Sequence, residues 1–204
     1  MERHNIARGE RTAPGSRTRR PGVRAGTLFA VLGLVAFLPM AARGDPQQTE
    51  EYRVKAAFLY HFTQMVDWPT EAPGDEKKAI VLCTIGKDPF DGNLEAALEG
   101  KQIGARPLEI RHLKQPGEAQ GCQVVFVADD RKQVAQTLAA LKDAAVLTVG
   151  DGEDFTKQGG MIGFSMDGDD KVRFVINVDA ASRARLKISS RLLVLAKAVI
   201  GSHP

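Results

Sequence analysis

Three short, mostly apolar runs constrain the fold of this chain more than any other feature of its sequence. They are AIVLCTI at 79–85, VVFV at 124–127 and VLTV at 146–149. Runs without apolar–polar alternation are typical of strands buried on both faces, as in a parallel sheet covered by helices. Segments with helical periodicity lie between them, at 91–98 and from Asp129 or Asp130 to Leu141. The sequence therefore predicts an α/β fold with a mainly parallel sheet.

The longest helical pattern lies before the first run, at 52–69 (YRVKAAFLYHFTQMVDWP). Its apolar residues recur at steps of three and four, with others widening the stripe: Val54, Ala57, Phe58, Leu59, Phe62, Met65 and Val66. This spacing predicts a helix that packs one face on the sheet. The alternative is that this face forms the lid of a binding surface.

Both ends of this helix have signals in the sequence. Asp45 as N-cap with Pro46 at the first helical position is one start, and Thr49 followed by acidic residues is a rival. Pro69 forces the residue before it away from helical geometry, so the helix is expected to end by Asp67 or Trp68.

The remaining patterns predict strands, a hairpin and a final helix. Residues 102–113 form one or two strands interrupted at Pro107, and 161–166 and 171–176 flank a polar, Gly-containing linker typical of a β-hairpin. Ser189 or Ser190 caps a C-terminal helix that Gly201 ends. Its predicted apolar face comprises Leu192, Leu193, Leu195, Ala196, Val199 and Ile200. The predicted fold class is thus α/β: a mainly parallel sheet flanked by helices, with an appended β-hairpin and a C-terminal helix.

Residues 1–44 have the pattern of a secretory signal peptide. Seven arginines within 1–24 precede an apolar run at 27–40, and Ala42-Arg43-Gly44 offers small residues to a peptidase. The run is shorter than the roughly 20 residues of a membrane span, although a retained anchor is the alternative. Arg19-Arg20 resembles a twin-arginine signal, but Pro21 and Gly22 follow, which favours ordinary secretion. We predict a signal peptide at 1–44 and one mature domain at 45–204, located in the periplasm of a bacterial cell.

The predicted leader also carries the positive charge of the chain. The whole sequence has a net charge of +3, with 28 basic and 25 acidic residues. Removing the eight basic and two acidic residues of 1–44 leaves 20 and 23, a net charge of about −3. A mildly acidic domain lacks the basic surface that nucleic-acid binding requires, so we expect no nucleic-acid partner.

The sequence contains no recognisable catalytic, cofactor or metal-binding pattern. The glycines at 159–163 follow a helical turn and precede a strand, the reverse of the dinucleotide-binding fingerprint. His61, His112 and His203 lack ligand-like spacing, and the aspartates at 167–170 lack the glutamate that completes a calcium loop. We therefore expect no catalytic residue, no cofactor, no metal and no enzymatic activity.

The two cysteines, Cys83 and Cys122, support two interpretations. An even count in an oxidising compartment favours a disulfide. However, Cys83 lies late in its strand and Cys122 lies just before its own, so parallel neighbouring strands would hold them apart. A bond across this offset would be strained and easily reduced.

A basic strip near the C-terminus is the candidate partner-binding region. Arg183, Arg185, Lys187 and Arg191 form either a solvated surface or a docking face for an acidic partner or membrane. Basic and apolar residues mix here as they do at interfaces, and the candidate partner-binding residues are Arg173, Asn177, Arg183, Arg185, Leu186 and Ser189. The alternative is that they cap and solvate the final helix.

Five stretches together resemble the YfiR family of bacterial periplasmic proteins. They are KAAFLYHFTQMVDWP (55–69), IVLCTIGKDPF (80–90), GCQVVFVAD (121–129), LTVGDGEDFTKQGGMIGF (147–164) and VRFVINVDAASRARLKISSRLLVLA (172–196). They follow the order of the family and cover almost the whole mature chain.

The resemblance implies a regulatory protein. The best-known members repress an inner-membrane diguanylate cyclase by binding its periplasmic sensor region, which lowers cyclic di-GMP and biofilm formation. An outer-membrane lipoprotein can sequester the repressor. A homodimer is a further possible assembly of the chain. Cys83 and Cys122 match a family pair linked to a redox response, whereas the later pair of some members is absent. The alternatives are a periplasmic small-solute sensor, because α/β sheets have crevices at their strand ends, and an enzyme.

Overall fold

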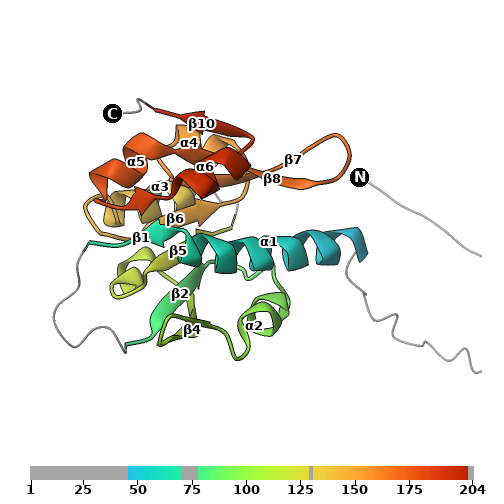
Figure 1. Cartoon of the computed structure of the whole chain (residues 1–204), viewed down its shortest axis with the longest axis horizontal. Coiled ribbons are helices and arrows are strands. Elements are labelled where there is room, and N and C mark those ends of the chain that lie inside the picture. Colours follow the sequence, from blue (N-terminus) through green and yellow to red (C-terminus); the bar gives the residue numbers. More distant parts are fainter. Residues whose placement is uncertain (1–45, 70–77, 129–130, 202–204) are drawn as a thin grey trace, which may run out of the picture. The chain divides into compact units, whose positions relative to one another are not determined.

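The computed structural model describes residues 46–69, 78–128 and 131–201 of the 204-residue chain. The predicted leader, the N-caps Asp45, Asp129 and Asp130, and the loop at 70–77 lie outside the described residues. Within the described part, helices cover both faces of one large mixed sheet (Figure 1). The predicted fold class is confirmed.

The sheet contains eight strands in the order β10-β8-β7-β6-β5-β2-β4-β3. Their bounds are β2 (Ile80–Ile85), β3 (Gln102–Ile103), β4 (Arg106–Leu113), β5 (Val124–Val127), β6 (Leu147–Gly150), β7 (Ile162–Met166), β8 (Val172–Asn177) and β10 (Ala198–Ile200). The three apolar runs form β2, β5 and β6, which pair in parallel at the centre of the sheet with Cys83 opposite Val125 and Val125 opposite Thr148. Pro107 lies inside β4, and the break between strands falls at Gly104, whose φ is +61°, so the predicted interruption at Pro107 is wrong.

One face of the sheet is covered by four helices: α1 (Pro46–Gln64), α2 (Asn93–Leu98), α5 (Val178–Arg183) and α6 (Ser190–Leu195). Helix α1 already includes Pro46, so the rival start at Thr49 is wrong, while the predicted cap Asp45 lies outside the described residues. It ends at Gln64, and Val66–Asp67 then forms β1, which pairs with β9 (Lys187–Ile188).

The buried side of α1 is rotated from the predicted stripe. Its buried residues are Lys55, Ala56, Leu59, Phe62 and Thr63. Ala57 is exposed, so its prediction as a core residue is wrong. Phe58 is half-buried, so its prediction as a core residue is only partly confirmed. Lys55 can lie on the buried side because its ammonium group pairs with Glu51 on α1 and with Asp151 after β6.

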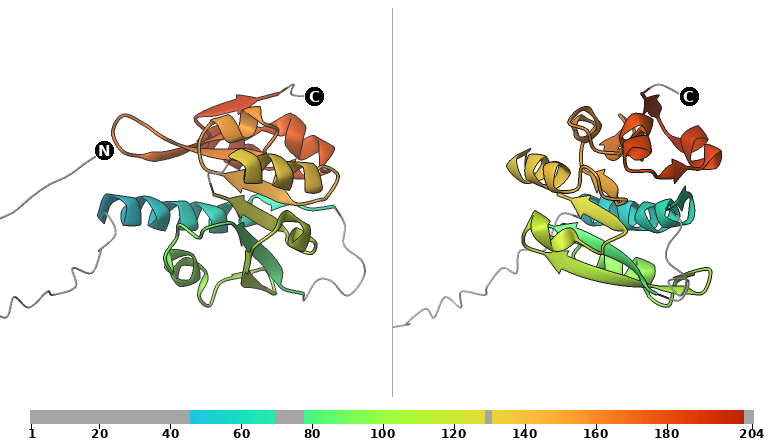
Figure 2. Two further views of the ribbon diagram at one scale, coloured as in Figure 1. Left: turned by 180° about the vertical axis from the view of Figure 1, so that it is seen from behind. Right: turned by 90° about the vertical axis from the view of Figure 1, so that its left-hand side faces the viewer.

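The opposite face is covered by η2 (Pro116–Ala119), α3 (Arg131–Ala140) and α4 (Asp154–Lys157). Figure 2 shows α1 and α3 on opposite sides of the sheet. Phe155 anchors α4 against Gly150 and Gly160, where an added Cβ would lie 2.3 and 2.1 Å from ring atoms. These two glycines are therefore required for close packing rather than for binding a phosphate.

Cys83 and Cys122 form a disulfide, with Cα atoms 6.0 Å apart. The predicted offset along the sheet is avoided because Cys122 does not continue the line of β5. Gly121, with φ of +88°, lets the chain turn from η2 across the face of β2 that carries the Cys83 side chain. A Cα separation of 6.0 Å lies in the usual range for disulfides, so the strand offset does not hold the two cysteines apart.

The C-terminal segment combines the predicted hairpin and a shorter helix than expected. Strands β7 and β8 pair antiparallel with Ser165 opposite Arg173, which confirms the hairpin. Ser189 caps α6, but the helix ends at Leu195 and Ala198–Ile200 forms β10 beside β8. The prediction of one helix to Ile200 is wrong, because the β-branched residues at its end cover the open edge of β8 instead.

Candidate functional site

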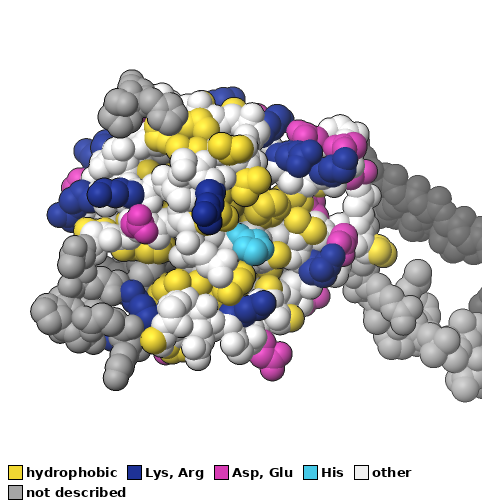
Figure 3. All heavy atoms as spheres, in the orientation of Figure 1, with side chains coloured by type: hydrophobic (Ala, Val, Ile, Leu, Met, Phe, Trp, Pro, Cys, Tyr) yellow, Lys and Arg dark blue, Asp and Glu magenta, His cyan; other side chains and the backbone are white. Residues whose placement is uncertain are grey.

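A groove lies between the N-terminal half of α1 and the β7–β8 hairpin. It measures about 550 Å³, and its lining residues are Gln47, Glu50, Glu51, Val54 and Phe58 from α1 and Met166, Asp170, Lys171, Val172 and Arg173 from the hairpin. Figure 3 shows hydrophobic side chains gathered over this part of the surface, with basic and acidic side chains around them. We call this region the α1–hairpin groove.

The floor of the groove is the outer surface of the aromatic core. The Phe58 ring is half-buried, and its centroid lies 5.4 Å from that of Phe174 and 5.9 Å from that of Phe62. Among the described residues, the exposed large hydrophobic side chains are Met166 on the hairpin and Val194 and Leu195 on α6, at 38, 83 and 59% exposure. Met166 lines the groove, and exposed apolar side chains of this size are typical of protein-interaction surfaces.

Charged groups with fixed partners lie next to the groove, where Asp167 begins the turn of the hairpin. Asp167 accepts hydrogen bonds from Arg173 Nε at 3.0 Å and pairs with Lys197 Nζ at 3.2 Å, while Lys197 also donates to Glu153 at 2.8 Å. The bond from Arg173, followed by that from Lys197, lowers the pKa of Asp167, and the bond from Lys197 lowers the pKa of Glu153. These pairs connect the hairpin to the segment after α6.

A buried ion-pair cluster fixes α1 above the carboxyl end of β6. Lys55 Nζ contacts carboxylate oxygens of Asp151 and Glu51 and lies 4.4 Å from the centroid of the Tyr52 ring. The Tyr52 hydroxyl donates to the second oxygen of Asp151. Sequence analysis missed this cluster, although Asp151 directly follows a buried strand, where polar groups gather in parallel sheets. The cluster occupies the carboxyl end of β6, where the alternative of a small-solute sensor would place its crevice.

The predicted partner-binding residues lie in separate places. Arg173 lines the α1–hairpin groove, whereas Arg183 and Arg185 are exposed at the C-terminal end of α5. Figure 1 shows α5 on the left and the tip of the hairpin on the right. The structure therefore does not bring these three arginines into one patch.

The other three members of the predicted set have local structural contacts. Asn177 caps α5 by accepting from the Ala180 N–H at 2.9 Å, and Ser189 accepts from the Leu192 N–H at 3.3 Å. Leu186 is buried in the core of the α1 face. The alternative that these residues cap and solvate the final helix holds for Ser189, whereas Asn177 caps α5 and Leu186 is buried.

Thr84, His112 and Glu95 form a hydrogen-bonded chain that the sequence did not reveal. Thr84 Oγ1 lies 2.8 Å from His112 Nδ1, and His112 Nε2 lies 2.9 Å from Glu95 Oε1. The order resembles a nucleophile–base–acid series, but Thr84 is only 2% exposed within β2. No substrate can reach a hydroxyl buried in this way, so we assign the chain to packing of α2 on β4.

The part of the chain that the structure describes lacks both a metal-binding cluster and a membrane-spanning helix. There, no cluster of three or more His, Cys, Asp or Glu side chains is arranged to hold a metal ion. No helix within those ranges is both long enough and apolar enough to cross a bilayer.

The geometry defines an α/β domain with an apolar groove on one face and a disulfide on the other. The YfiR/HmsC-like family model matches residues 52–197, so the chain belongs to the YfiR/HmsC-like family. This confirms the resemblance seen in the sequence. No curated relative matches the chain.

Two solved structures are similar in outline. A conserved domain protein from Vibrio cholerae O1 biovar El Tor has 10% identity and a TM-score of 0.49. An ABC domain in complex with L-Trp from Streptococcus pneumonia has 11% identity and a TM-score of 0.49. Each alignment covers 71% of this chain, which spans 60% of the length of either structure.

Proposed function

We propose that this protein is a periplasmic regulator that binds and represses an inner-membrane diguanylate cyclase. Binding to the periplasmic sensor region of the cyclase would lower cyclic di-GMP and biofilm formation, and an outer-membrane lipoprotein would compete for the repressor. Membership in the YfiR/HmsC-like family fits a regulatory role of this kind rather than catalysis.

The observation that carries the proposal is the α1–hairpin groove with the exposed apolar end of α6. An apolar centre with Phe58 at its floor and a charged rim with Arg173 is the composition of protein interfaces. Val194 is 83% exposed and Leu195 is 59% exposed, so a partner that covers them would remove apolar surface from water.

The basic end of α5 is the rival docking surface. Arg183 and Arg185 are exposed there and would attract an acidic partner. The two surfaces differ in their chemistry, because the first depends on apolar contact and the second on charge. Substitutions can therefore separate them.

The test uses the mature chain and the purified periplasmic region of a membrane diguanylate cyclase from the same genome. We expect Val194→Asp/Leu195→Asp to weaken binding by at least about tenfold, because charged groups would be buried in an apolar contact. Arg183→Glu/Arg185→Glu is the control, because it also changes two exposed side chains. It should leave the rate at which the chain dissociates from the cyclase region unchanged. Weakened binding in the arginine pair alone would assign the partner to α5.

A cellular measurement tests the function itself. Deletion of the gene should raise cyclic di-GMP in a host that expresses the cyclase, and the Val194→Asp/Leu195→Asp variant should fail to restore the lower level. Unchanged cyclic di-GMP on deletion would contradict the proposal. Export is part of it, so mass spectrometry of the protein from its host should find a chain that starts near Asp45.

A further inference from the structure

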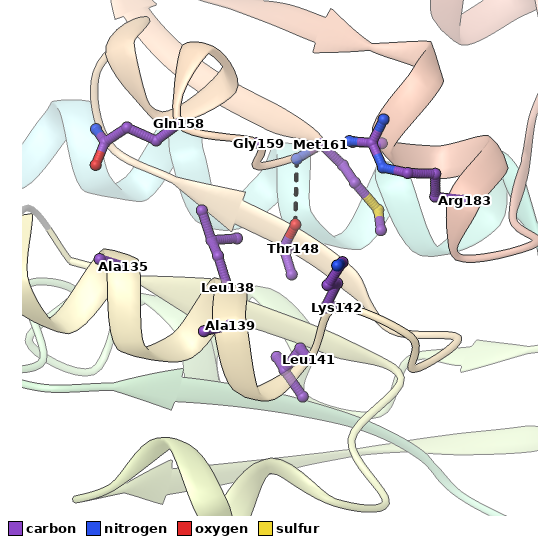
Figure 4. A pocket seen from close by; sticks show the side chains of 11 residues that line it. Ala135, Leu138, Ala139, Leu141, Lys142, Thr148, Gln158, Gly159, Met161 and Arg183 are labelled. Carbon is purple, nitrogen blue, oxygen red and sulfur yellow. Dashed lines mark hydrogen bonds between the residues drawn. The ribbon is translucent and has the colours of Figure 1, made fainter.

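A second cavity lies on the other side of the domain, between the C-terminal end of α3 and α5. It measures about 470 Å³. Figure 4 shows its lining, which includes Leu138 from α3, Thr148 from β6 and Arg183 from α5. The proposed repressor function, which uses the α1–hairpin groove, does not involve this cavity.

The walls of the cavity are mainly apolar, and the hydroxyl at its floor already has a hydrogen-bond partner. Leu138, Leu141 and Met161 supply the apolar surface, and Ala135 and Ala139 leave room on the exposed side of α3. The polar group at its floor, Thr148 Oγ1, accepts a hydrogen bond from the Met161 N–H at 3.1 Å. The interior therefore favours an apolar group over one that needs hydrogen bonds.

Both charged residues of the lining are cations. Lys142 follows α3 and Arg183 ends α5, and Figure 4 shows them on the same side of the cavity, with the Met161 side chain between them. Within the described ranges, neither forms an ion pair, and no carboxylate lines the cavity. Two uncompensated cations beside an apolar cavity are complementary to a molecule with one anionic end and an apolar body.

We propose that this cavity binds a small amphipathic carboxylate. The carboxylate contacts the Arg183 guanidinium, whose paired N–H groups match its two oxygens, while Lys142 adds a second positive charge. The apolar body lies against Leu138, Leu141 and Met161. The volume of 470 Å³ lies within the range of small-molecule sites. This ligand site is independent of the proposed repression of a cyclase.

The test is a titration of the mature chain with octanoate at neutral pH, followed by calorimetry and by backbone amide NMR. We expect saturable binding with shifts centred on the end of α3, the segment at 158–161 and α5. Neutral 1-octanol should bind at least about tenfold more weakly, because it gains no charge-assisted hydrogen bond. Failure to saturate by about 10 mM octanoate would overturn the proposal.

Variants separate this site from non-specific binding of a fatty acid. Lys142→Gln and Arg183→Gln should each weaken octanoate binding by about tenfold, whereas Arg191→Gln, on exposed α6, should not change it. Ala139→Leu should also weaken it by filling the cavity from an exposed position that does not disturb the core. Equal affinity in the Lys142, Arg183 and Arg191 variants, or shifts confined to the α1–hairpin groove, would overturn the assignment.

Discussion

The two faces of the sheet are held by different means. On the α1 face, one 19-residue helix packs aromatic rings against the sheet, and Phe62 contacts both Phe164 and Phe174 with centroids 5.8 and 5.1 Å away. On the α3 face, shorter elements cover mostly aliphatic side chains and the single ring of Phe155, and Cys122, just after the four-residue η2, is joined to β2 by the disulfide. Burial of area stabilises the first face, and a covalent link stabilises the second.

This difference also separates the two candidate sites. The long helix extends beyond its aromatic contacts toward the hairpin and leaves apolar surface at the α1–hairpin groove, where a protein partner can cover it. The smaller cavity lies between α3 on one face and α5 on the other, and its cationic edge suits a small anion. Each of the following changes tests one part of this comparison.

The largest expected loss of stability is on the α1 face. Phe62→Ala should lower the free energy of unfolding by about 3–5 kcal/mol, because Phe62 is fully buried among aromatic rings. Phe58→Ala should cost less, since Phe58 is half-buried at the floor of the groove. Urea denaturation of both variants measures the difference. Equal losses would show that Phe58 belongs to the core as fully as Phe62.

Removal of the disulfide should rank next. Cys83→Ala/Cys122→Ala opens a loop with a sequence separation of 39 and should cost up to about 4 kcal/mol in the chain-entropy account. Because the two cysteines are only 0 and 3% exposed, the native bond should react slowly with a reductant until the α3 face opens. Thiol trapping in native buffer checks this. Rapid, complete reduction without loss of structure would restore the interpretation of an easily reduced redox switch.

The buried cation of α1 should contribute somewhat less. Lys55→Met leaves Asp151 and Glu51 without their cation, and we expect a loss of about 3 kcal/mol, at the low end for a broken buried pair because both carboxylates reach solvent. The double variant Lys55→Met/Asp151→Asn should recover part of the loss. Thermal and urea unfolding measure both, and an unchanged stability in Lys55→Met would show that α1 is held by apolar packing alone.

The sequence predicts those parts of the fold that depend on local pattern. The apolar runs at 79–85 and 124–127 specify buried parallel strands, and the linker at 167–170 specifies a hairpin. It does not predict contacts whose partners are distant, such as Lys55 with Asp151, 96 residues away. A lysine within an apolar stripe is assigned to solvent unless its partner is known. The same limit explains why the α1–hairpin groove was missed.

The C-terminal segment shows a second limit. Leu195 and Ile200 fit one helical stripe, yet the structure exposes Leu195 and places Ile200 in a strand. The open edge of β8 is available only in the folded sheet, and it overrides the helical preference of the segment. Val194, outside the predicted apolar face, is correspondingly the most exposed of the large apolar side chains described.

The smallest expected effect concerns Asp167 at the rim of the groove and depends on pH. Hydrogen bonds from Arg173 and Lys197 hold the pKa of Asp167 below the ordinary value of about 3.9. Because its folded pKa is depressed, these bonds stabilise the hairpin fully above about pH 4, and the contribution disappears as the pH falls through the folded value. Asp167→Asn should therefore lower the melting temperature slightly at pH 6, and this difference from the parent chain should shrink at an acidic pH below the folded pKa of Asp167. The control is Arg173→Gln/Lys197→Gln, in which Asp167→Asn should have no further effect at either pH. A difference between parent and Asp167→Asn that stays constant across this range would show that solvent screens these pairs completely and that apolar contacts alone hold the hairpin beside α1.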